Sequence, residues 1–245
     1  MRARQRHFKP KSASASLALD TRYIHGVSDN TTVQTWTDLS GNSRDATQAT
    51  AGDRATYRTA IQGGNGILRF SGDFYEAAFT TGTAYSTYSV YKRTGSASNP
   101  FSNATFVYAA GISGGTAGSD RRYQLYYEDG TPNKFTVFSN ATTAISITRD
   151  DNWNVHSISA PIGTGTARYL LNGANEQTAS VSALAGVPSG TVRMIIGDNS
   201  WITAGSQLRF VGDLGSVLTF ETAHEAPLRK RIEHSQGYSF KIACS

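Results

Sequence analysis

The amino-acid sequence predicts an all-β protein, a sandwich of two packed antiparallel sheets that ends in a short helix. The 24 glycines and the frequent Ser and Thr favour short strands joined by turns over long helices. Polar and apolar residues alternate with period two in many segments, as in half-buried strands. Hydrophobic residues make up 38% of the 245 residues, which is enough to bury a substantial core.

Eleven segments are predicted to be strands. They are residues 66–70, 86–91, 106–110, 123–127, 134–138, 143–147, 155–160, 167–171, 191–196, 207–210 and 215–220. Asn-Gly, Pro-Ser-Gly and Gly-Asp steps separate several of them, as expected for turns. So many strands in one chain imply two packed sheets.

One tight turn and one helix are predicted from local signals. Leu171-Asn172-Gly173 predicts a hairpin, because Asn-Gly accepts the positive φ angles that such a turn requires. Thr222 and Glu225 have the spacing of a capping box, Pro227 lies in the first turn where proline is tolerated, and Gly237 marks the expected end. A short surface helix is expected between them.

The first 16 residues are predicted to form a flexible basic arm, and residues 17–245 a single domain, since no linker divides them. The arm carries a noticeable share of the net charge of +5, on Arg2, Arg4, Arg6, Lys9 and Lys11. Such an arm can hold nucleic acid or an acidic protein surface through charge alone, so it is a candidate anchor. A solvated terminus without a partner is the alternative.

The cysteine count and the hydropathy exclude several classes of protein. Cys244 is the only cysteine, so no internal disulfide and no cysteine-based metal cluster is expected. No run approaches the ~18 consecutive apolar residues of a membrane span. The basic start leads into Ser-Ala-Ser-Ala-Ser and not into an apolar signal core. We therefore expect neither membrane insertion nor classical secretion.

A family resemblance covers nearly the whole chain from about Ser16. Trp36-Thr-Asp38-Leu-Ser40-Gly41-Asn42, followed by Asp45-Ala46, Gln48 and Tyr57, resembles the opening signature of laminin-G-like members of the concanavalin A-like lectin and glucanase superfamily. Later segments of the family are similar, in order, to Gly66-Ile-Leu-Arg-Phe70-Ser-Gly72-Asp73, Tyr169-Leu-Leu-Asn172-Gly173, Ile196-Gly197 and Phe210-Val-Gly212-Asp213. The chain departs from the pattern at Ser216, where an acidic residue is common, and at Leu19-Asp20, where a Trp-Leu-Asp type of segment is usual.

The resemblance implies a jelly roll of two curved sheets, whose concave face or rim loops often bind glycans, sometimes with calcium. Domains of this kind that stand alone without a signal peptide resemble bacteriophage particle proteins such as head decorations, fibres and receptor binders. Because the architecture hosts lectins, adhesion modules, glycosidases and structural domains, it indicates fold better than function.

Catalysis is not expected from the sequence. A retaining glucanase needs two carboxylates about 5 Å apart, and the resemblance would place them on a Glu-x-Asp-x-Glu strand, which this chain lacks. Glu128-Asp129 and Asp150-Asp151 are adjacent pairs, whose side chains would point to opposite faces of a strand. Gly111-Ile-Ser113-Gly-Gly115 has the spacing of a nucleophile elbow, but the glycines that follow oppose the helix this motif requires.

The candidate glycan-binding residues are Trp201, Asp198, Asn199 and Tyr127. An aromatic ring can cover the apolar face of a sugar while amides and carboxylates bind its hydroxyls. Trp201 is close in sequence to a carboxylate, Asp198, and to an amide, Asn199, and Tyr127 lies beside Glu128. Packing into the core is the alternative for both aromatic residues.

Calcium is the cofactor that the resemblance keeps open, with Asp73 and Asp213 as candidate ligands. Both lie in Gly-Asp turns, and hard cations take oxygen ligands from such turns. Turn geometry alone also explains an aspartate there. The five histidines are scattered without the helical spacing of a zinc pair.

Together these observations predict a non-enzymatic surface protein of a bacteriophage virion, docked by its arm and able to bind host or environmental glycans. A free carbohydrate-binding lectin is the first alternative, and a glycan hydrolase is the second. The expected partner is a capsid or other virion protein, with no membrane or nucleic acid partner. A homo-oligomer is expected, because exposed edge strands can pair. The expected location is the virion surface, or else the cytoplasm or the medium after release without a signal peptide.

Overall fold

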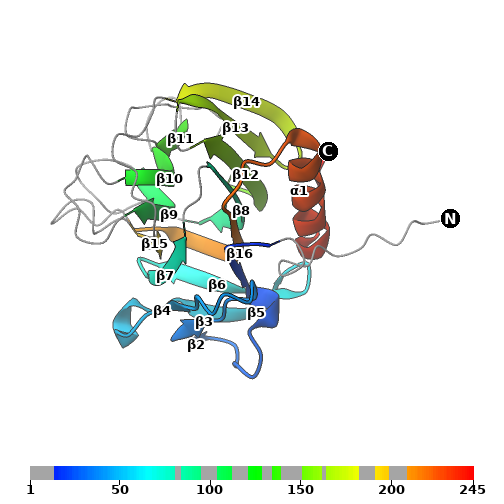
Figure 1. The fold of residues 1–245 in the computed structure, drawn as a ribbon. Helices are drawn as coiled ribbons and strands as arrows, with labels where there is room; N and C mark the ends of the chain where they lie inside the picture. The colour runs from blue at the N-terminus through cyan, green and yellow to red at the C-terminus, as the bar shows by residue number, and fades with distance from the viewer. Residues whose placement is uncertain are drawn as a thin grey trace.

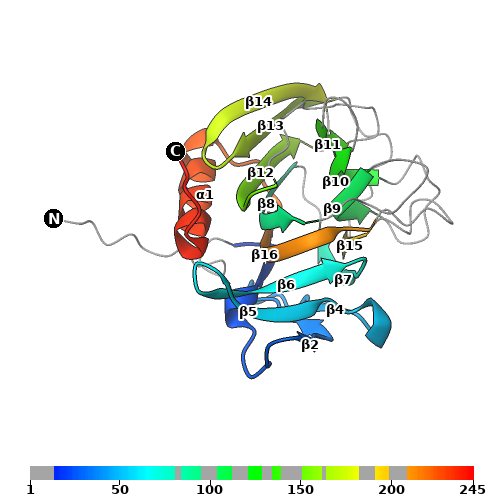
Figure 2. The ribbon, with the colours of Figure 1, turned by 180° about the vertical axis from the view of Figure 1, so that it is seen from behind.

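The computed structural model describes residues 14–80, 84–94, 104–111, 121–128, 134–138, 151–161, 164–181, 191–198 and 209–245. Within them the strands form two antiparallel sheets, and one helix follows the last strand (Figures 1 and 2). The predicted fold class, an all-β sandwich with a short C-terminal helix, is confirmed. Among these residues no helix is long and apolar enough to cross a membrane.

The larger sheet, sheet A, holds nine strands in the order β14-β13-β12-β8-β16-β6-β5-β2, with β1 also paired to β16. The bounds are β1 Leu17–Asp20, β2 Thr31–Thr32, β5 Thr56–Gln62, β6 Asn65–Ser71, β8 Ala84–Arg93, β12 Asn154–Pro161, β13 Gly165–Leu171, β14 Ala174–Val181 and β16 Val211–Phe220. A short 3-10 turn, η2 (Thr21–Tyr23), follows β1.

The second sheet, sheet B, holds seven strands in the order β11-β10-β9-β15-β7-β4-β3. The bounds are β3 Thr35–Trp36, β4 Ala46–Thr47, β7 Tyr75–Thr80, β9 Ala104–Gly111, β10 Arg121–Glu128, β11 Lys134–Phe138 and β15 Thr191–Ile196. A second 3-10 turn, η3 (Ala51–Asp53), lies between β4 and β5. Some neighbouring strands, such as β5 and β6, are consecutive in the chain, whereas crossings between the sheets bring others, such as β6 and β16, together from distant parts of the sequence.

The main core lies between the two sheets and is rich in aromatic rings. Phe70 packs edge to face with Tyr75 and Phe210, at ring-centre distances of 5.9 and 5.8 Å. His156 is buried in the same core, where the hydroxyl of Tyr91 lies 2.9 Å from its Nε2. Burial holds the pKa of His156 well below its usual range, so this side chain is a neutral part of the core.

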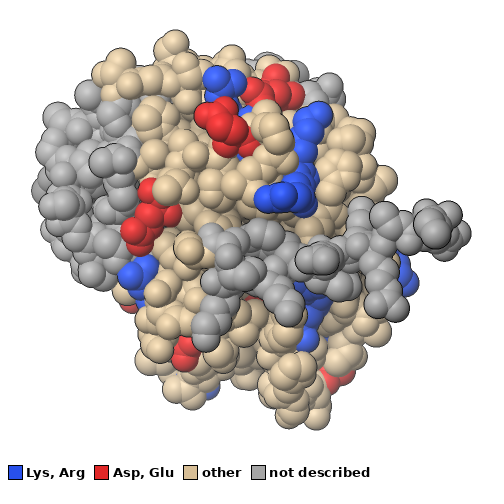
Figure 3. Space-filling model, turned by 45° about the vertical axis from the view of Figure 1, so that its right-hand side comes forward, with Lys and Arg blue, Asp and Glu red and all other residues tan. Residues whose placement is uncertain are grey.

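The helix α1 (Ala226–Phe240) covers the other face of sheet A, over β12 and β8. Ile232 packs with Tyr88, Leu218 and Phe220 beneath it. The central strands β8, β12 and β16 are therefore buried on both faces. Figure 3 shows Lys and Arg side chains on the outer surface of this helical layer.

Both ends of the helix differ from the prediction. Glu225 is the N-cap and no side chain caps the helix, so the predicted capping box with Thr222 does not form. Gly237 lies inside the helix, which ends at Phe240. A Cβ at Gly237 would lie 2.3 Å from the sulfur of Cys244. The glycine therefore makes room for the C-terminal segment that folds back along the helix.

The Asn172-Gly173 hairpin is confirmed. Both residues have positive φ angles, 51° and 76°, and they join β13 to β14. The strand β14 had not been predicted, because its polar sequence lacks clear alternation. The predicted strand 143–147 lies outside the described residues, and residues 209–210 precede β16 in an irregular conformation.

Contacts with the folded domain begin before residue 17, which was the predicted start of the domain. Ala15 is buried, and the backbone N–H of Ser16 donates to the carbonyl oxygen of Thr219 at 2.8 Å. These two residues are therefore packed against the folded domain, next to β16. The five basic residues of the predicted arm, Arg2, Arg4, Arg6, Lys9 and Lys11, lie outside the described residues.

The opening signature of the sequence has a structural role in the loop between β3 and β4. The Asp38 carboxylate accepts from the backbone N–H groups of Ala18, Ser40 and Arg44 at 2.9, 2.9 and 3.1 Å, and from the Ser40 hydroxyl at 2.6 Å. The Asn42 amide donates to the carbonyl oxygen of Ser16 at 3.2 Å. These contacts tie the loop to the first strand.

Candidate functional site

Two Gly-Asp turns lie side by side at one end of sheet B. Gly72-Asp73 precedes β7, Gly197-Asp198 follows β15, and the two strands are neighbours in the sheet. A Cβ at Gly197 would lie 2.6 Å from the carbonyl oxygen of Asp73, so this approach requires glycine. The N–H of Phe210 donates to the carbonyl oxygen of Gly197 at 2.7 Å. This bond brings the residues before β16 to the same place.

Arg209 joins the two turns to η3. Its Nη1 donates to Asp53 Oδ1 at 3.1 Å and to the carbonyl oxygen of Gly72 at 2.7 Å. Its Nε lies 3.5 Å from Asp198 Oδ2, as an ion pair longer than a hydrogen bond. The guanidinium carbon lies 5.8 Å from the centre of the Phe74 ring, within the range of a cation–π contact. Asp53, Phe74, Asp198 and Arg209 are named the rim cluster below.

The charged side chains of the rim cluster differ in how deeply they are buried. The side chain of Asp198 is fully buried, whereas those of Arg209 and Asp53 are 26% and 28% exposed. The pKa of the adjacent Asp73 is raised, mainly because its carboxyl group is buried. The charge of Asp53 also raises this pKa, whereas the hydrogen bonds from Ser71 and the charge of Arg209 lower it. The positive charge of Arg209 thus balances part of the negative charge of Asp53, Asp73 and Asp198, and its guanidinium is partly exposed to solvent.

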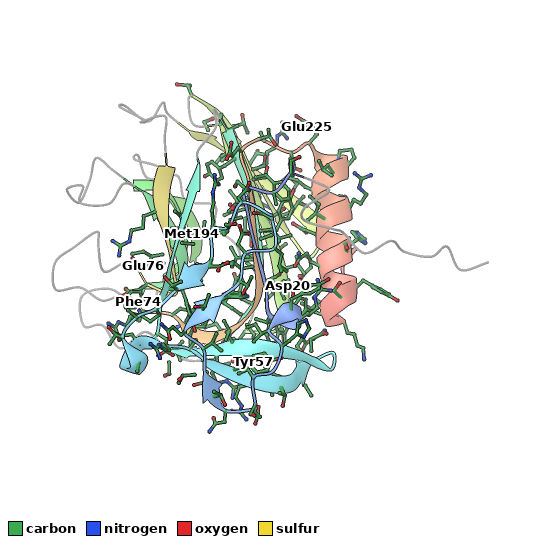
Figure 4. The ribbon with its side chains drawn as sticks, turned by 60° about the horizontal axis from the view of Figure 1, so that its bottom comes forward. Asp20, Tyr57, Phe74, Glu76, Met194 and Glu225 are labelled. Carbon is green, nitrogen blue, oxygen red and sulfur yellow. The ribbon has the colours of Figure 1, made fainter. Side chains whose placement is uncertain are left out.

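A second charged pair lies one step along β7. Glu76 and Arg193 form an ion pair between β7 and β15, with side chains 40% and 29% exposed. Because alternate residues of an extended chain share a face, Phe74 and Glu76 lie on the opposite face from the buried Tyr75. Figure 4 shows Phe74 and Glu76 on the side of the molecule away from α1. The rim cluster therefore adjoins the outer face of sheet B.

The structure brings two of the predicted glycan-binding residues to the same end of sheet B. Asp198 lies two residues beyond Ile196, which pairs with Tyr108 of β9. Tyr127 lies two residues beyond Leu125, which pairs with the same Tyr108. Since β15 and β10 run in the same direction on either side of β9, both residues lie toward one sheet end. Trp201 and Asn199 lie outside the described residues.

The two candidate calcium ligands are engaged with protein partners. The carboxylate of Asp213 accepts from Arg69 Nε at 2.7 Å and from Nη2 at 2.9 Å. Asp73 Oδ2 accepts from the N–H of Ser71 at 2.7 Å. Over the described ranges, no three His, Cys, Asp or Glu side chains are grouped to hold a metal ion. A calcium site stays a prediction, and at Asp213 it would require Arg69 to be displaced.

Three residues of the cluster had not been predicted from the sequence: Asp53, Phe74 and Arg209. They belong to three segments that the sheet topology brings together, and no local motif marks any of them. The Gly-Asp step before Phe74 was a usable signal, because it placed a turn directly before a large aromatic residue. The pairing of Arg209 with Asp53 spans 156 residues and depends on the fold.

The chemistry of the rim cluster suits polar recognition. Arg209 presents a planar set of N–H donors, and Asp53 presents acceptor oxygens at a similar depth. Phe74 is half-buried and supplies an apolar ring beside them. Donors, acceptors and an aromatic face within one contact region are the groups that sugar rings require.

No protein-family model and no curated protein matches the sequence. Solved structures do match in fold. A sialidase of Trypanosoma rangeli in complex with sialic acid aligns with a TM-score of 0.61 at 10% identity, over 94% of this chain and 34% of the sialidase. The binding domain of botulinum neurotoxin serotype D aligns with a TM-score of 0.56 at 11% identity, over 93% of this chain and 53% of the other. At these identities the likeness shows the β-sandwich fold alone.

The comparison corrects the prediction that the chain is not an enzyme. That prediction depended on a missing carboxylate motif of glucanases, on adjacent carboxylate pairs and on a nucleophile-elbow spacing without a following helix. The structures that share the fold include sialidases, one of them with a covalent intermediate, so the missing motif does not exclude catalysis. The chain spans about a third of the sialidases' length, and the likeness assigns no activity to it.

Proposed function

We propose that this chain is a carbohydrate-binding β-sandwich of the laminin-G-like kind, with its ligand held at the rim cluster. The observation that carries the proposal is the partly exposed Arg209, which donates to Asp53 and lies beside the Phe74 ring. Solved structures of the same fold include a sialidase with sialic acid, which supports a glycan as the ligand.

Each member of the cluster has a distinct role in this proposal. Arg209 and Asp53 bind sugar hydroxyls, and Arg209 also pairs with the carboxylate of an acidic sugar. Phe74 covers an apolar sugar face. Asp198 is buried, so it positions Arg209 and does not contact the ligand.

Trp201 follows Asp198 by three residues in the sequence. Asn199 is the next residue after Asp198. We include both in the proposed site as ligand contacts.

The test is binding of the intact chain to an array of sialylated, uronic and neutral oligosaccharides, followed by calorimetry with the strongest binder. Phe74→Ala and Trp201→Ala should each weaken binding at least about fivefold, since a stacked ring contributes on the order of 1 kcal/mol or more. Arg209→Lys keeps the charge but removes the planar fork, and it should weaken binding similarly.

Arg58→Ala is the matched control. Arg58 forms an exposed ion pair with Asp29, at an N–O distance of 3.3 Å, away from the rim cluster. Its removal should leave glycan affinity unchanged. If no glycan binds, or if Arg58→Ala weakens binding as much as Phe74→Ala, the site is assigned wrongly.

A role on the surface of a bacteriophage particle remains a further proposal. It depends on the family resemblance and on the basic arm, and the comparisons give it no support. A virion protein as partner and a homo-oligomer belong to the same proposal. Co-sedimentation of the chain with particles in fixed stoichiometry would support it, and a chain that stays in the supernatant would end it.

A further inference from the structure

The outer face of α1 carries basic and aromatic side chains in one line. Arg231, His234 and Tyr238 follow one another at helical intervals of three and four residues, so they project from one face. Lys230 borders this line and Lys241, the C-cap, ends it. These five residues are named the α1 stripe, and all except the half-buried His234 are exposed. Figure 3 shows cationic side chains over the helix on this face.

The positive charge of the α1 stripe is left available for a partner. In the part of the chain that the structure describes, no ion pair involves Lys230, Arg231 or Lys241. The acidic residue within α1, Glu233, is buried against sheet A. With a rise of about 1.5 Å per residue, the stripe extends over roughly 16 Å.

The C-terminal end of the stripe is also where the described chain exposes large apolar side chains. Tyr23, Ile61 and Tyr238 are 53%, 39% and 57% exposed. The Arg22 guanidinium lies 5.3 Å from the centre of the Phe240 ring, which places η2 at the end of α1. Gln62 Nε2 donates to the carbonyl oxygen of Phe240 at 2.8 Å, which places the β5–β6 hairpin there. Apolar side chains thus adjoin the cations.

An anionic sugar polymer suits this combination better than the alternatives. Cations alone attract any polyanion, but exposed tyrosine rings add platforms for the apolar faces of sugars. Double-stranded nucleic acid binds such a surface through its phosphates, to which tyrosine rings add little. A second copy of the chain, paired about a two-fold axis, would place the same cations against each other.

We propose that the α1 stripe is a binding surface for an anionic polysaccharide, a chain of sugars bearing carboxylate or sulfate groups. It lies on the far side of sheet A from the rim cluster and does not depend on that site (Figure 4). The cations pair with the acidic groups, and Tyr238 and Tyr23 contact the sugar rings between them.

The test is binding of the intact chain to polygalacturonate, measured by biolayer interferometry at low and at physiological salt. Dextran is the neutral comparison and double-stranded DNA the charged one. The double variant Lys230→Ser with Arg231→Ser removes two charges from the stripe. Arg54→Ser with Arg58→Ser removes the same number from another surface. Circular dichroism checks that each variant is folded.

We expect polygalacturonate to bind more weakly as salt rises, and dextran not to bind. The stripe variant should raise Kd at least about tenfold and Tyr238→Ala about threefold, with the control pair within about twofold. Absence of polygalacturonate binding at low salt overturns the proposal. So does an equal loss in the control pair, or tight DNA binding together with an unchanged affinity of Tyr238→Ala for polygalacturonate.

Discussion

Asp38 is the residue on which the opening signature depends. Its buried carboxylate accepts three backbone N–H groups, so removal of the carboxylate leaves three donors without a partner. We expect Asp38→Ala to lower the free energy of unfolding by about 3 kcal/mol, measured by urea denaturation. Asp29→Ala removes an exposed carboxylate and should leave the urea midpoint nearly unchanged. Equal midpoints for the two variants would contradict this role.

Gly197 controls the geometry of the rim cluster. Its φ angle is 93°, and a Cβ would lie 2.6 Å from the Asp73 carbonyl oxygen and 2.7 Å from the Phe70 ring. Gly197→Ala should therefore cost about 2–4 kcal/mol of stability and weaken glycan binding.

Two other glycines serve to separate the effect of the positive φ angle from the effect of the close contact. Gly64 has a φ angle of 84° but no atom within 4 Å of its would-be Cβ, and Gly52 has neither constraint. Thermal unfolding should rank the alanine variants Gly52, Gly64 and Gly197 in order of increasing loss. A Gly197→Ala protein no less stable than Gly64→Ala would show that the close approach of the two turns is unimportant.

At the scale of elements, the sequence could predict the helix and most strands, but not the ends of the helix. Period-two alternation is typical of strands with one solvated face. The strands β12 and β16 are buried on both faces but still alternate, because small hydroxyl residues such as Ser157 and Ser216 face α1. The capping-box spacing of Thr222 and Glu225 was misleading. The start of α1 is fixed instead by its packing on sheet A.

Docking of α1 buries a carboxyl group, so we expect it to depend on pH. Burial raises the pKa of Glu233 to about 7, although the N–H of Gly173 and the charge of Arg229 lower it. The folded state therefore holds more protons than the unfolded state between about pH 4.5 and 7. Stability from this group is full below that range and is lost as pH rises, by about 3 kcal/mol at most.

Glu233→Gln tests this dependence. Urea denaturation from pH 4.5 to 8 should show that the variant gains stability relative to the wild type as pH rises. A constant difference between the two proteins across this range would show that Glu233 does not titrate on folding.

His224 produces the opposite dependence at the same helix. Burial, together with Arg229, lowers its pKa to about 4, and Tyr88 holds its Nδ1 at 2.8 Å. The unfolded state binds the proton more readily, so the stability from neutral His224 is lost as pH falls from about 6.5 to 4. In His224→Gln the loss of stability over this range should be smaller than in the wild type. Parallel urea midpoints between pH 7 and 4 would contradict it.

At the scale of the whole molecule, the sequence could predict the sandwich but not the site. The fold follows from many weak signals that agree along the chain. The rim cluster depends on a few residues, Asp53, Phe74, Asp198 and Arg209, which meet because strands of both sheets end at one place. A contact between residues 156 positions apart, such as that of Arg209 with Asp53, produces no periodic pattern in the sequence. Asp198 was predicted as a polar neighbour of Trp201 in the sequence, and it is the one member of the cluster that was predicted.

The boundary between arm and domain can be tested on the whole chain. Ser16 donates from its N–H and from its hydroxyl to Thr219, at 2.8 and 3.3 Å, and Ala15 is buried beside β16. Deletion of residues 1–13 should leave Tm unchanged, whereas deletion of residues 1–16 should lower it by about 3–6 °C, as expected for about 1.5 kcal/mol in a domain of this size. Scanning calorimetry with coincident circular dichroism also shows whether unfolding is one transition. If both deletions lower Tm equally, residues before 14 contribute to the fold and the domain is longer than proposed.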